Sequence, residues 1–308
     1  MTSLIATPLA SGAMFFGESP RYYNDTLYLS DMTGKKIYTI NPTTGEKQVL
    51  LEVENQPNGM CFAADGSLIY SSMFDGKLYR LKDGKTVLYA DLNPLITGYC
   101  GDMVIDRHGR VYIDDTGARV LHGETPRAGR LLVVDNVEKE DGTRDVRSVA
   151  EDAIFPNALF IDNTGEHLYL AETFAHRLNR FTIGSDESLS ERIELWSPSS
   201  LPKPQAAEEG AILSIDGGCM DAEGGIWLSM MAFKQFVRID QEKRVTHVVD
   251  VDGDATACTL GGEDGRTLFL VVNKVPEGEG LLSAMVGRRT RCSVWTVRVE
   301  VGRGGALP

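Results

Sequence analysis

Residues 57–70 read Pro-Asn-Gly-Met-Cys-Phe-Ala-Ala-Asp-Gly-Ser-Leu-Ile-Tyr, and this unit decides the fold. It begins with a turn-forming cluster, continues with a short apolar run, turns at Asp65-Gly66 and ends with an apolar run that contains a tyrosine. An Asp-Gly pair supplies the positive φ that a tight hairpin needs. The unit therefore predicts two short strands joined by a turn.

The same unit recurs along the whole chain. The other copies are Glu18-Ser-Pro-Arg21 before Leu27-Tyr-Leu29, Gly101-Asp-Met103 before Val111-Tyr-Ile113, Phe155-Pro-Asn-Ala158 before Leu168-Tyr-Leu170, Ile215-Asp-Gly-Gly218 before Ile226-Trp-Leu228, and Ala255-Thr-Ala-Cys258 before Leu268-Phe-Leu270. A period of roughly 40 to 60 residues built from short strands and turns is typical of a β-propeller, with one blade per repeat.

The chain has 308 residues, of which 42% are hydrophobic, and a formal net charge of -13. Length alone would suggest about two domains. All-β proteins of this size are commonly one domain, so we expect a single domain over residues 1–308. The negative charge argues against binding to nucleic acid or to an anionic membrane. Acidic side chains could instead hold a cation.

Five cysteines are spread along the chain without a Cys-x-x-Cys pair, which fits reduced thiols in a cytoplasmic protein. Cys61, Cys219 and Cys258 fall on apolar runs, so we expect them in the core. The N-terminus lacks the pattern of a secretory signal. No apolar run approaches the ~20 residues that cross a bilayer. These features favour a cytoplasmic location, and we expect a monomer or homodimer.

Three stretches lack strand character: Arg119 to Ala128, Asp186 to Ala211 and Pro276 to Arg291. They are rich in Pro, Gly, Ser and charge, and we expect them to form long loops over one face. The terminal runs 3–9 and 293–299 both read as strands. Pairing of these runs would close the ring and hide an edge strand.

One position of the repeat is dominated by carboxylates and carboxamides: Glu18, Asn58, Asp102, Asn157, Asp216 and the segment Ala255 to Ala257. The repeat would bring these oxygens to one channel mouth, where they would repel each other unless a cation lay among them. Hard divalent ions prefer such ligands. Ca²⁺ is the first choice, and Mg²⁺, Mn²⁺ and Zn²⁺ stay open. The alternative is strand caps or Asx-turns, which stays open for Asn58 because Gly59 follows it.

Four motifs carry a resemblance over nearly the whole chain. They are Glu18-Ser-Pro-Arg21, Phe155-Pro-Asn157 with Leu168 to Arg177, Asp216-Gly with Asp221 to Trp227, and Ala255 to Gly262 with Gly265 to Phe269. In this order they resemble the SMP-30/gluconolactonase/luciferin-regenerating-enzyme family. The resemblance implies an all-β, six-bladed β-propeller with four-stranded antiparallel blades, one divalent metal in the channel, and hydrolysis of lactones, chiefly sugar lactones. It also implies that Glu18, Asn157 and Asp216 bind the metal and that Asp216 is the general base.

The third repeat departs from the family pattern. Many sugar-lactone members carry Arg-x-Asn-Asp where this chain has Tyr99-Cys100-Gly101-Asp102, so the groups that would hold sugar hydroxyls are missing. The run is closer to the drug-responsive lactonase branch of the same superfamily. Tyr99 with Phe15 and Phe16 could line a more apolar pocket.

The sequence therefore predicts a lactonase, in which a divalent metal polarises the lactone carbonyl and Asp216 assists the attack of water. Asp102 is the second candidate catalytic residue, either as a metal ligand or as the support of one. Candidate substrate contacts are Asn58, Tyr99, Arg21 and Phe16. Two alternatives stay open: a phosphotriester hydrolase, and a non-catalytic propeller whose metal only stabilises the ring.

Other polar residues have simpler interpretations. Glu172 is better explained as a salt-bridge partner of Arg177 than as a contact at the rim of the site. The histidines show no metal-ligand spacing, and His122 is expected at the surface. The chain has no Gly-x-Ser-x-Gly elbow and no Gly-rich phosphate loop, so serine-hydrolase and nucleotide-binding functions have no support.

Overall fold

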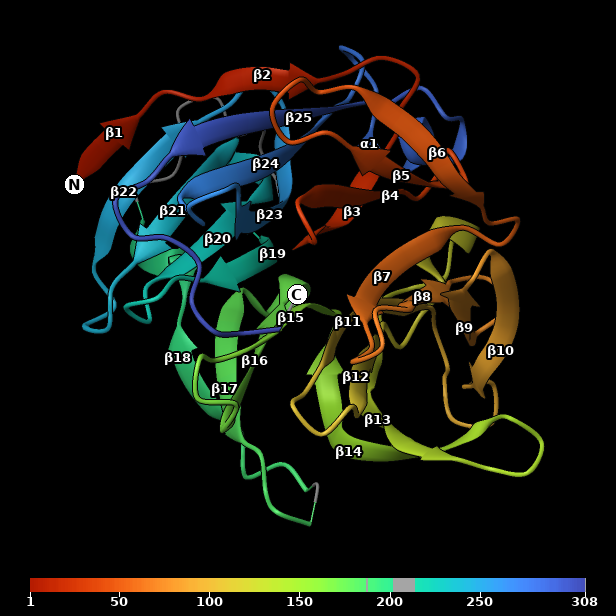
Figure 1. Ribbon diagram of the computed structural model, residues 1–308. Helices are drawn as coiled ribbons and strands as arrows, with labels where there is room; N and C mark the ends of the chain where they lie inside the picture. The colour runs from red at the N-terminus through yellow and green to blue at the C-terminus, as the bar shows by residue number, and fades with distance from the viewer. Residues whose placement is uncertain (187, 202–213, 308) are drawn as a thin grey trace.

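Six antiparallel sheets stand around a central axis in the computed structural model (Figure 1). The structure describes residues 1–186, 188–201 and 214–307. Each sheet corresponds to one repeat, and its strands follow the chain outward from the axis, except that the outermost strands of the fifth and sixth sheets come from the N-terminus. The innermost strands contact each other in turn around the ring. The predicted six-bladed β-propeller with four-stranded blades is therefore confirmed.

The first three blades are each formed by consecutive strands. They are β3 (Gly17–Tyr23), β4 (Thr26–Asp31), β5 (Lys36–Ile40) and β6 (Lys47–Glu52); β7 (Pro57–Phe62), β8 (Leu68–Ser72), β9 (Lys77–Lys82) and β10 (Lys85–Asp91); and β11 (Cys100–Ile105), β12 (Val111–Asp115), β13 (Ala128–Glu138) and β14 (Arg144–Ile154).

The last three blades follow the same order. Their strands are β15 (Pro156–Ile161), β16 (His167–Glu172), β17 (Arg177–Thr182) and β18 (Ile193–Trp196); β19 (Ile215–Met220), β20 (Ile226–Met230), β21 (Gln235–Ile239) and β22 (Val245–Asp250); and β23 (Asp254–Gly261), β24 (Thr267–Lys274) and β25 (Arg291–Arg298), completed by β2 (Thr7–Ala10).

The core lies between the blades. The second strands β8, β12 and β20 are buried along their whole length, because a blade covers each of their faces. Their continuous apolar runs follow from this two-sided burial. Between the second and third blades, for example, Ile69 and Leu78 pack with Met103, Ile113 and Leu132.

The N-terminal strands close the ring. β2 pairs antiparallel with β25, with Thr7 opposite Thr296 and Pro8 opposite Trp295, as the two terminal runs predicted. The preceding β1 (Thr2–Leu4) differs from the prediction, because it pairs parallel with β22 as a fifth strand of the fifth blade. The N-terminus therefore joins two blades.

Two of the three predicted loops lie at the end of the ring where the inner strands begin. They contain the 3₁₀-helix η1 (Val120–His122) and the helix α1 (Leu281–Val286), which sequence periodicity did not indicate. The third stretch, Asp186 to Ala211, differs from the prediction in two ways. It contains the strand β18, and its first part, between β17 and β18, lies at the opposite end of the ring. Residues 187 and 202–213 lie outside the described part of the chain. The remaining 3₁₀-helices are η2 (Thr173–Ala175), η3 (Pro198–Ser200) and η4 (Met231–Phe233).

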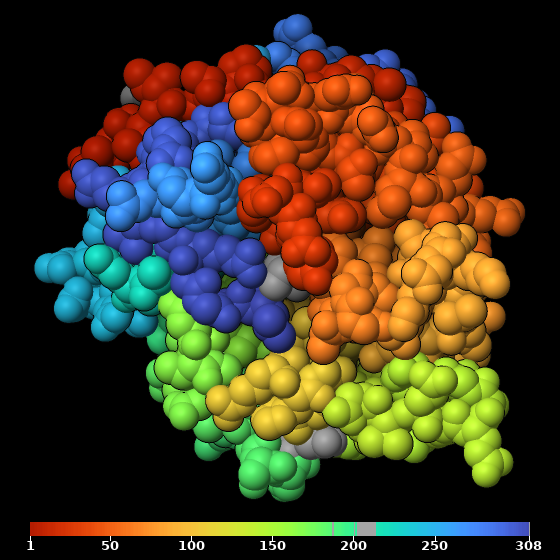
Figure 2. Space-filling view, in the orientation of Figure 1, coloured from red at the N-terminus to blue at the C-terminus, as the bar shows by residue number. Residues whose placement is uncertain are grey.

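The segment after β25 runs to the middle of the ring, where it is blue in Figure 2. Arg303 pairs with Asp221 in an isolated β-bridge, and its backbone N–H donates to the Gly265 carbonyl at 2.8 Å. Its guanidinium donates to the Tyr22 carbonyl at 3.1 Å. The tail thus crosses the end where the inner strands finish. Among the described helices, none is long and apolar enough to cross a membrane.

Candidate active site at one end of the channel

A β-bulge interrupts every inner strand at the same point. The register between the first and second strands shifts at residues 18–21, 57–60, 100–103, 156–159, 215–218 and 255–257. A bulge leaves a residue out of the ladder and re-aims its side chain. The polar column predicted from the repeat therefore coincides with these bulges, at the end of the ring where the inner strands begin.

Asn157 and Asp216 lie together in this column. The Asn157 Nδ2 donates to Asp216 Oδ1 and also lies 3.3 Å from Thr173 Oγ1. Thr173 Oγ1 in turn donates to the Ile215 carbonyl at 3.0 Å. Asp216 is only 1% exposed, and its Oδ2 is buried without a hydrogen-bond partner. A buried oxygen without a donor is costly, so this atom is where a cation or a proton would be most stabilising.

The electrostatics of the column also favour a cation. Burial raises the pKa of Glu18 well above its usual range, and the negative charges of Asp216 and Asp102 raise it further. Burial likewise raises the pKa of Asp216, helped by Asp254 and Asp102, whereas the hydrogen bond from Asn157 opposes the rise. The two carboxylates resist ionisation together, as carboxylates sharing one site do.

The residues present fit a hard divalent cation. Glu18, Asp216 and Asn157 offer carboxylate and carboxamide oxygens, the ligands that Ca²⁺ prefers. Among the described residues, no group of three or more His, Cys, Asp or Glu side chains is arranged to hold a metal. The candidate set contains only two side chains of those types, because its third member is an asparagine. Binding would also require Asn157 to present Oδ1 instead of Nδ2, an amide rotation of about 180°.

Asp102 is held from three sides. Its Oδ1 accepts hydrogen bonds from Ser19 Oγ at 3.0 Å and Arg21 Nη2 at 2.8 Å, and its Oδ2 accepts one from the Leu159 N–H at 3.1 Å. Its own N–H donates to Asp114 Oδ2 at 2.9 Å. Asp102 therefore links the first, third and fourth blades. Both of its carboxylate oxygens already accept hydrogen bonds from protein groups.

Asn58 and Arg21 have different surroundings. Asn58 Oδ1 accepts a hydrogen bond from Ser19 Oγ at 3.2 Å, and its amide nitrogen lies 4.0 Å from Met32 Sδ. The Arg21 guanidinium also donates to the Met103 carbonyl at 2.7 Å and lines a pocket further along the inner strands. A substrate role for either residue stays a prediction.

Phe16 and Tyr99 belong to one apolar cluster with Met32, Met73 and Met285. The Tyr99 hydroxyl is hydrogen-bonded to His122 Nδ1, and burial raises the pKa of Tyr99 to about 12. His122 is exposed, as expected for a loop residue.

Phe15 turns away from this cluster, and its ring lies 4.6 Å from the Arg288 guanidinium. The cluster of Phe16, Met32, Met73, Tyr99 and Met285 therefore forms an apolar wall, of which Phe15 is not a member. The wall approaches the polar column at Met32, beside Asn58.

A second set of polar residues was missed from the sequence. These residues end the second strands and hold the backbone around the bulges. Asp31 accepts from the N–H groups of Phe15 and Phe16, Asp114 from those of Gly101 and Asp102, and Asn273 Oδ1 from that of Gly17. A polar residue just after each second apolar run was the available signal.

Glu172 is the most heavily paired member of this set. It is fully buried and accepts from the Ile154 N–H and from Asn179 Nδ2, both at 2.7 Å. Its Oε1 forms ion pairs with Arg177 and Arg192, each at 3.1 Å. The predicted salt bridge with Arg177 is confirmed. Thr173, which contacts Asn157, follows Glu172 directly, so this network supports the polar column.

We expect Glu172→Gln to lower the free energy of unfolding by about 3 kcal/mol, because it leaves two guanidinium groups without their buried counter-charge. Urea denaturation measures the change. Glu166→Gln, at an exposed position of the same blade, is the matched control and should be neutral. Equal urea midpoints for the two variants would show that the buried ion pairs of Glu172 do not stabilise the fold.

Comparison with known proteins adds family information. A family model described as the SMP-30/Gluconolactonase/LRE-like region matches residues 16–274. Lactonase drp35 of Staphylococcus aureus (strain USA300) is 24% identical over 210 residues, which cover 66% of this chain. The match spans 60% of that relative's length.

Solved structures share the fold. Regucalcin from Agrobacterium tumefaciens, described as a calcium-binding protein, superposes with a TM-score of 0.76 at 18% identity and covers 98% of this chain and 97% of its own. A gluconolactonase from Xanthomonas campestris gives 0.68 at 20% identity, covering 92% of this chain and 86% of its own. At these identities the likeness shows the fold alone.

Proposed function

The chain belongs to the SMP-30/gluconolactonase/LRE-like family, and from this premise we propose that it is a lactone hydrolase that depends on one divalent cation. The observation that carries the proposal is the buried Asp216, whose Oδ2 has no partner and whose Oδ1 is held by Asn157. The name of the relative Lactonase drp35 supports the same activity.

Glu18, Asn157 and Asp216 would hold the cation, and because every donor is an oxygen they favour a hard ion, of which Ca²⁺ remains the first choice. The bound ion would polarise the lactone carbonyl as a Lewis acid. Burial and neighbouring carboxylates raise the pKa of both Glu18 and Asp216, so a bound cation would offset the cost of their negative charges. The description of regucalcin as a calcium-binding protein is consistent with this choice.

Asp216 Oδ2 would accept the proton of the attacking water. Asn157 Nδ2 donates to Asp216 Oδ1, and the amide would exchange this bond for coordination through its own Oδ1 when the cation binds. One water would add to the carbonyl carbon, the ring C–O bond would break, and the proton taken up by Asp216 would pass to the ring oxygen, which leaves as the hydroxyl of a hydroxy acid. Asp102, whose oxygens bind Ser19, Arg21 and the Leu159 N–H, would position the neighbouring blades without itself moving a proton.

The apolar wall indicates the substrate class. Tyr99 is buried and Gly101 has no side chain where sugar-lactone members carry Arg and Asn, and Phe16 and Met32 pack on the same side as Asn58. Few donors are therefore available for sugar hydroxyls, and a site built without them gains little from a hydroxylated ring. Aliphatic or aromatic lactones fit this wall better than gluconolactone.

A hydrolysis assay on chelator-treated protein tests the proposal. We expect the rate to fall at least about 100-fold on chelation and to return with added Ca²⁺. We also expect kcat/KM for an alkyl or aryl lactone to exceed that for gluconolactone by about tenfold. The same assay is repeated with Mg²⁺, Mn²⁺ or Zn²⁺ in place of Ca²⁺, and with a phosphotriester in place of the lactone. Unchanged turnover after complete metal removal would contradict the metal dependence, and turnover of the phosphotriester alone would contradict the lactonase.

A further inference from the structure

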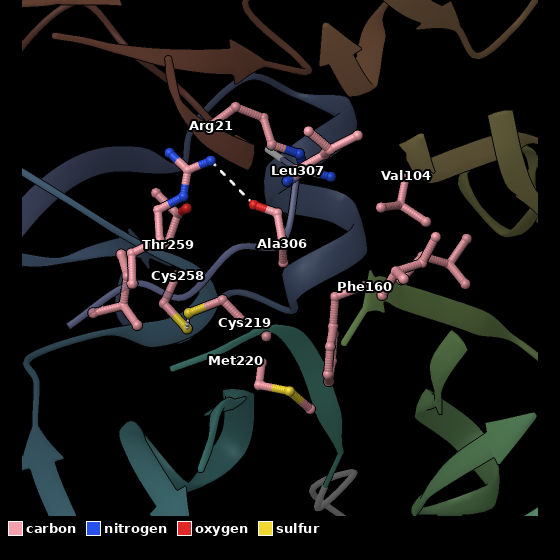
Figure 3. A pocket seen from close by; sticks show the side chains of 14 residues that line it. Arg21, Val104, Phe160, Cys219, Met220, Cys258, Thr259, Ala306 and Leu307 are labelled. Carbon is pink, nitrogen blue, oxygen red and sulfur yellow. Dashed lines mark hydrogen bonds between the residues drawn. The ribbon is translucent and has the colours of Figure 1, made fainter. Parts of the chain in front are cut away.

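A pocket of about 60 Å³ lies further along the same inner strands, away from Glu18 (Figure 3). Its walls include Arg21, Phe160 and Met220, with Leu307 of the C-terminal tail on one side. A void of this size holds a few water molecules. The proposed function uses none of its thiols.

Two cysteines meet in this pocket. Cys219 comes from β19 in the fifth blade and Cys258 from β23 in the sixth, and Figure 3 shows their side chains pointing toward each other. Their Sγ atoms are 3.9 Å apart. The two strands approach closely here, because a Cβ added at Gly217 would lie 2.6 Å from the Ala257 Cα. A disulfide needs closely spaced strands with facing side chains.

Cys219 and Cys258 both line the pocket, and Cys219 alone of the five cysteines is partly exposed, because Cys258 is buried. Cys219 is partly exposed and lines the pocket, whereas Cys61, Cys100 and Cys292 are at most 2% exposed. The prediction that Cys219 packs in the core like Cys61 is therefore only partly correct. An oxidant that reaches the pocket would meet Cys219 first.

We propose that Cys219 and Cys258 are a redox modification site, at which a peroxide produces a reversible disulfide that joins the fifth and sixth blades. Hydrogen peroxide is close to water in size, so it fits a void that holds a few waters. The hydrogen bond with the Cys258 thiol raises the pKa of Cys219, and burial raises it further. Because the thiolate is the reactive form, the reaction is slow at neutral pH and accelerates as the pH rises.

The chemistry balances in two steps. The Cys219 thiolate attacks one peroxide oxygen, the O–O bond breaks, and the products are a sulfenic acid and, after protonation, water. The Cys258 thiol then attacks the Cys219 sulfur, the S–O bond breaks, and a second water leaves. Both sulfurs are oxidised to the disulfide and the peroxide is reduced to two waters. A small thiol reverses the bond by exchange.

The test uses the full-length reduced protein treated with hydrogen peroxide, then denatured and alkylated. We expect a mass loss of two hydrogens, three alkylated cysteines instead of five, and a peptide that links residues 219 and 258. The melting temperature should rise by about 5 °C and return after addition of dithiothreitol.

Matched variants separate this linkage from other oxidation. Cys219→Ser and Cys258→Ser should lose the thermal shift, whereas Cys61→Ala in the second blade should keep the linked peptide. Oxidation of Met220, which lines the same pocket, adds an oxygen and is distinguished by mass. Five free thiols after treatment, a sulfinic acid at Cys219 without a link, or cross-linked dimers alone would each overturn the proposal.

Discussion

The Asp216→Asn variant should lose cation-dependent lactone hydrolysis by about a thousand-fold while keeping its fold. The substitution removes the unpartnered acceptor Oδ2 and one of the two carboxylates proposed to hold the ion. The carboxamide has nearly the same volume, so the packing of β19 should not change. Initial rates with and without Ca²⁺, alongside circular dichroism, measure the effect.

The thermal stability of the same variant tests independently whether Asp216 binds the cation. In metal-free protein, removing one of two repelling carboxylates should leave the melting temperature equal to or above that of the wild type, because the pKa of Asp216 is raised. Saturating Ca²⁺ should stabilise only the wild type, by about 2.7 kcal/mol at a hundred times the dissociation constant.

Asp252→Asn is the matched control for both measurements. Asp252 is exposed and pairs with Lys274 at the surface, so this variant should keep turnover and the Ca²⁺ shift. An Asp216→Asn protein that retains cation-dependent turnover would remove Asp216 from the mechanism.

Deletion of residues 1–10 should produce the largest loss of stability. It removes β2, the outer strand of the sixth blade, together with β1 on the fifth. It also removes Leu4, Ala6 and Ala10 from the apolar clusters beneath. We expect a loss of about 4 kcal/mol, a large part of the stability of a typical domain. The bared edge of β25 should promote aggregation.

Urea denaturation and light scattering measure both effects. Deletion of residues 1–5 alone is the control, because it leaves β2 in place and removes only the fifth strand of a sheet that is otherwise complete. Its cost should be less than half that of the longer deletion. An unchanged melting temperature for the 1–10 deletion would show that β2 does not close the ring.

The blades could be predicted because their signals are local. Each repeat carries its own turn and its own apolar runs, as at Asp65-Gly66 before Leu68. The polar column could be found because the bulge falls at the same place in each repeat, so alignment of the repeats aligns Asn157 with Asp216. The residues of the inner strands did not indicate from the sequence that a bulge interrupts each strand.

The rest depends on contacts between distant parts of the chain. Arg21 pairs with Asp102, which is 81 residues away, and Cys219 meets Cys258 across two blades. The parallel pairing of β1 with β22 joins opposite ends of the sequence. Helix α1 is only six residues long, too short to show a helical period. No spacing rule in one sequence reveals such pairs.

We propose that one divalent cation lies among Glu18, Asn157 and Asp216 in the protein that hydrolyses lactones. A crystal grown with Ca²⁺ from a sample with measured turnover, recorded at a wavelength where calcium scatters anomalously, would locate the ion. We expect one anomalous peak within coordination distance of an oxygen of each of the three residues. A map from active protein with no peak there, or with its peak elsewhere, would contradict it.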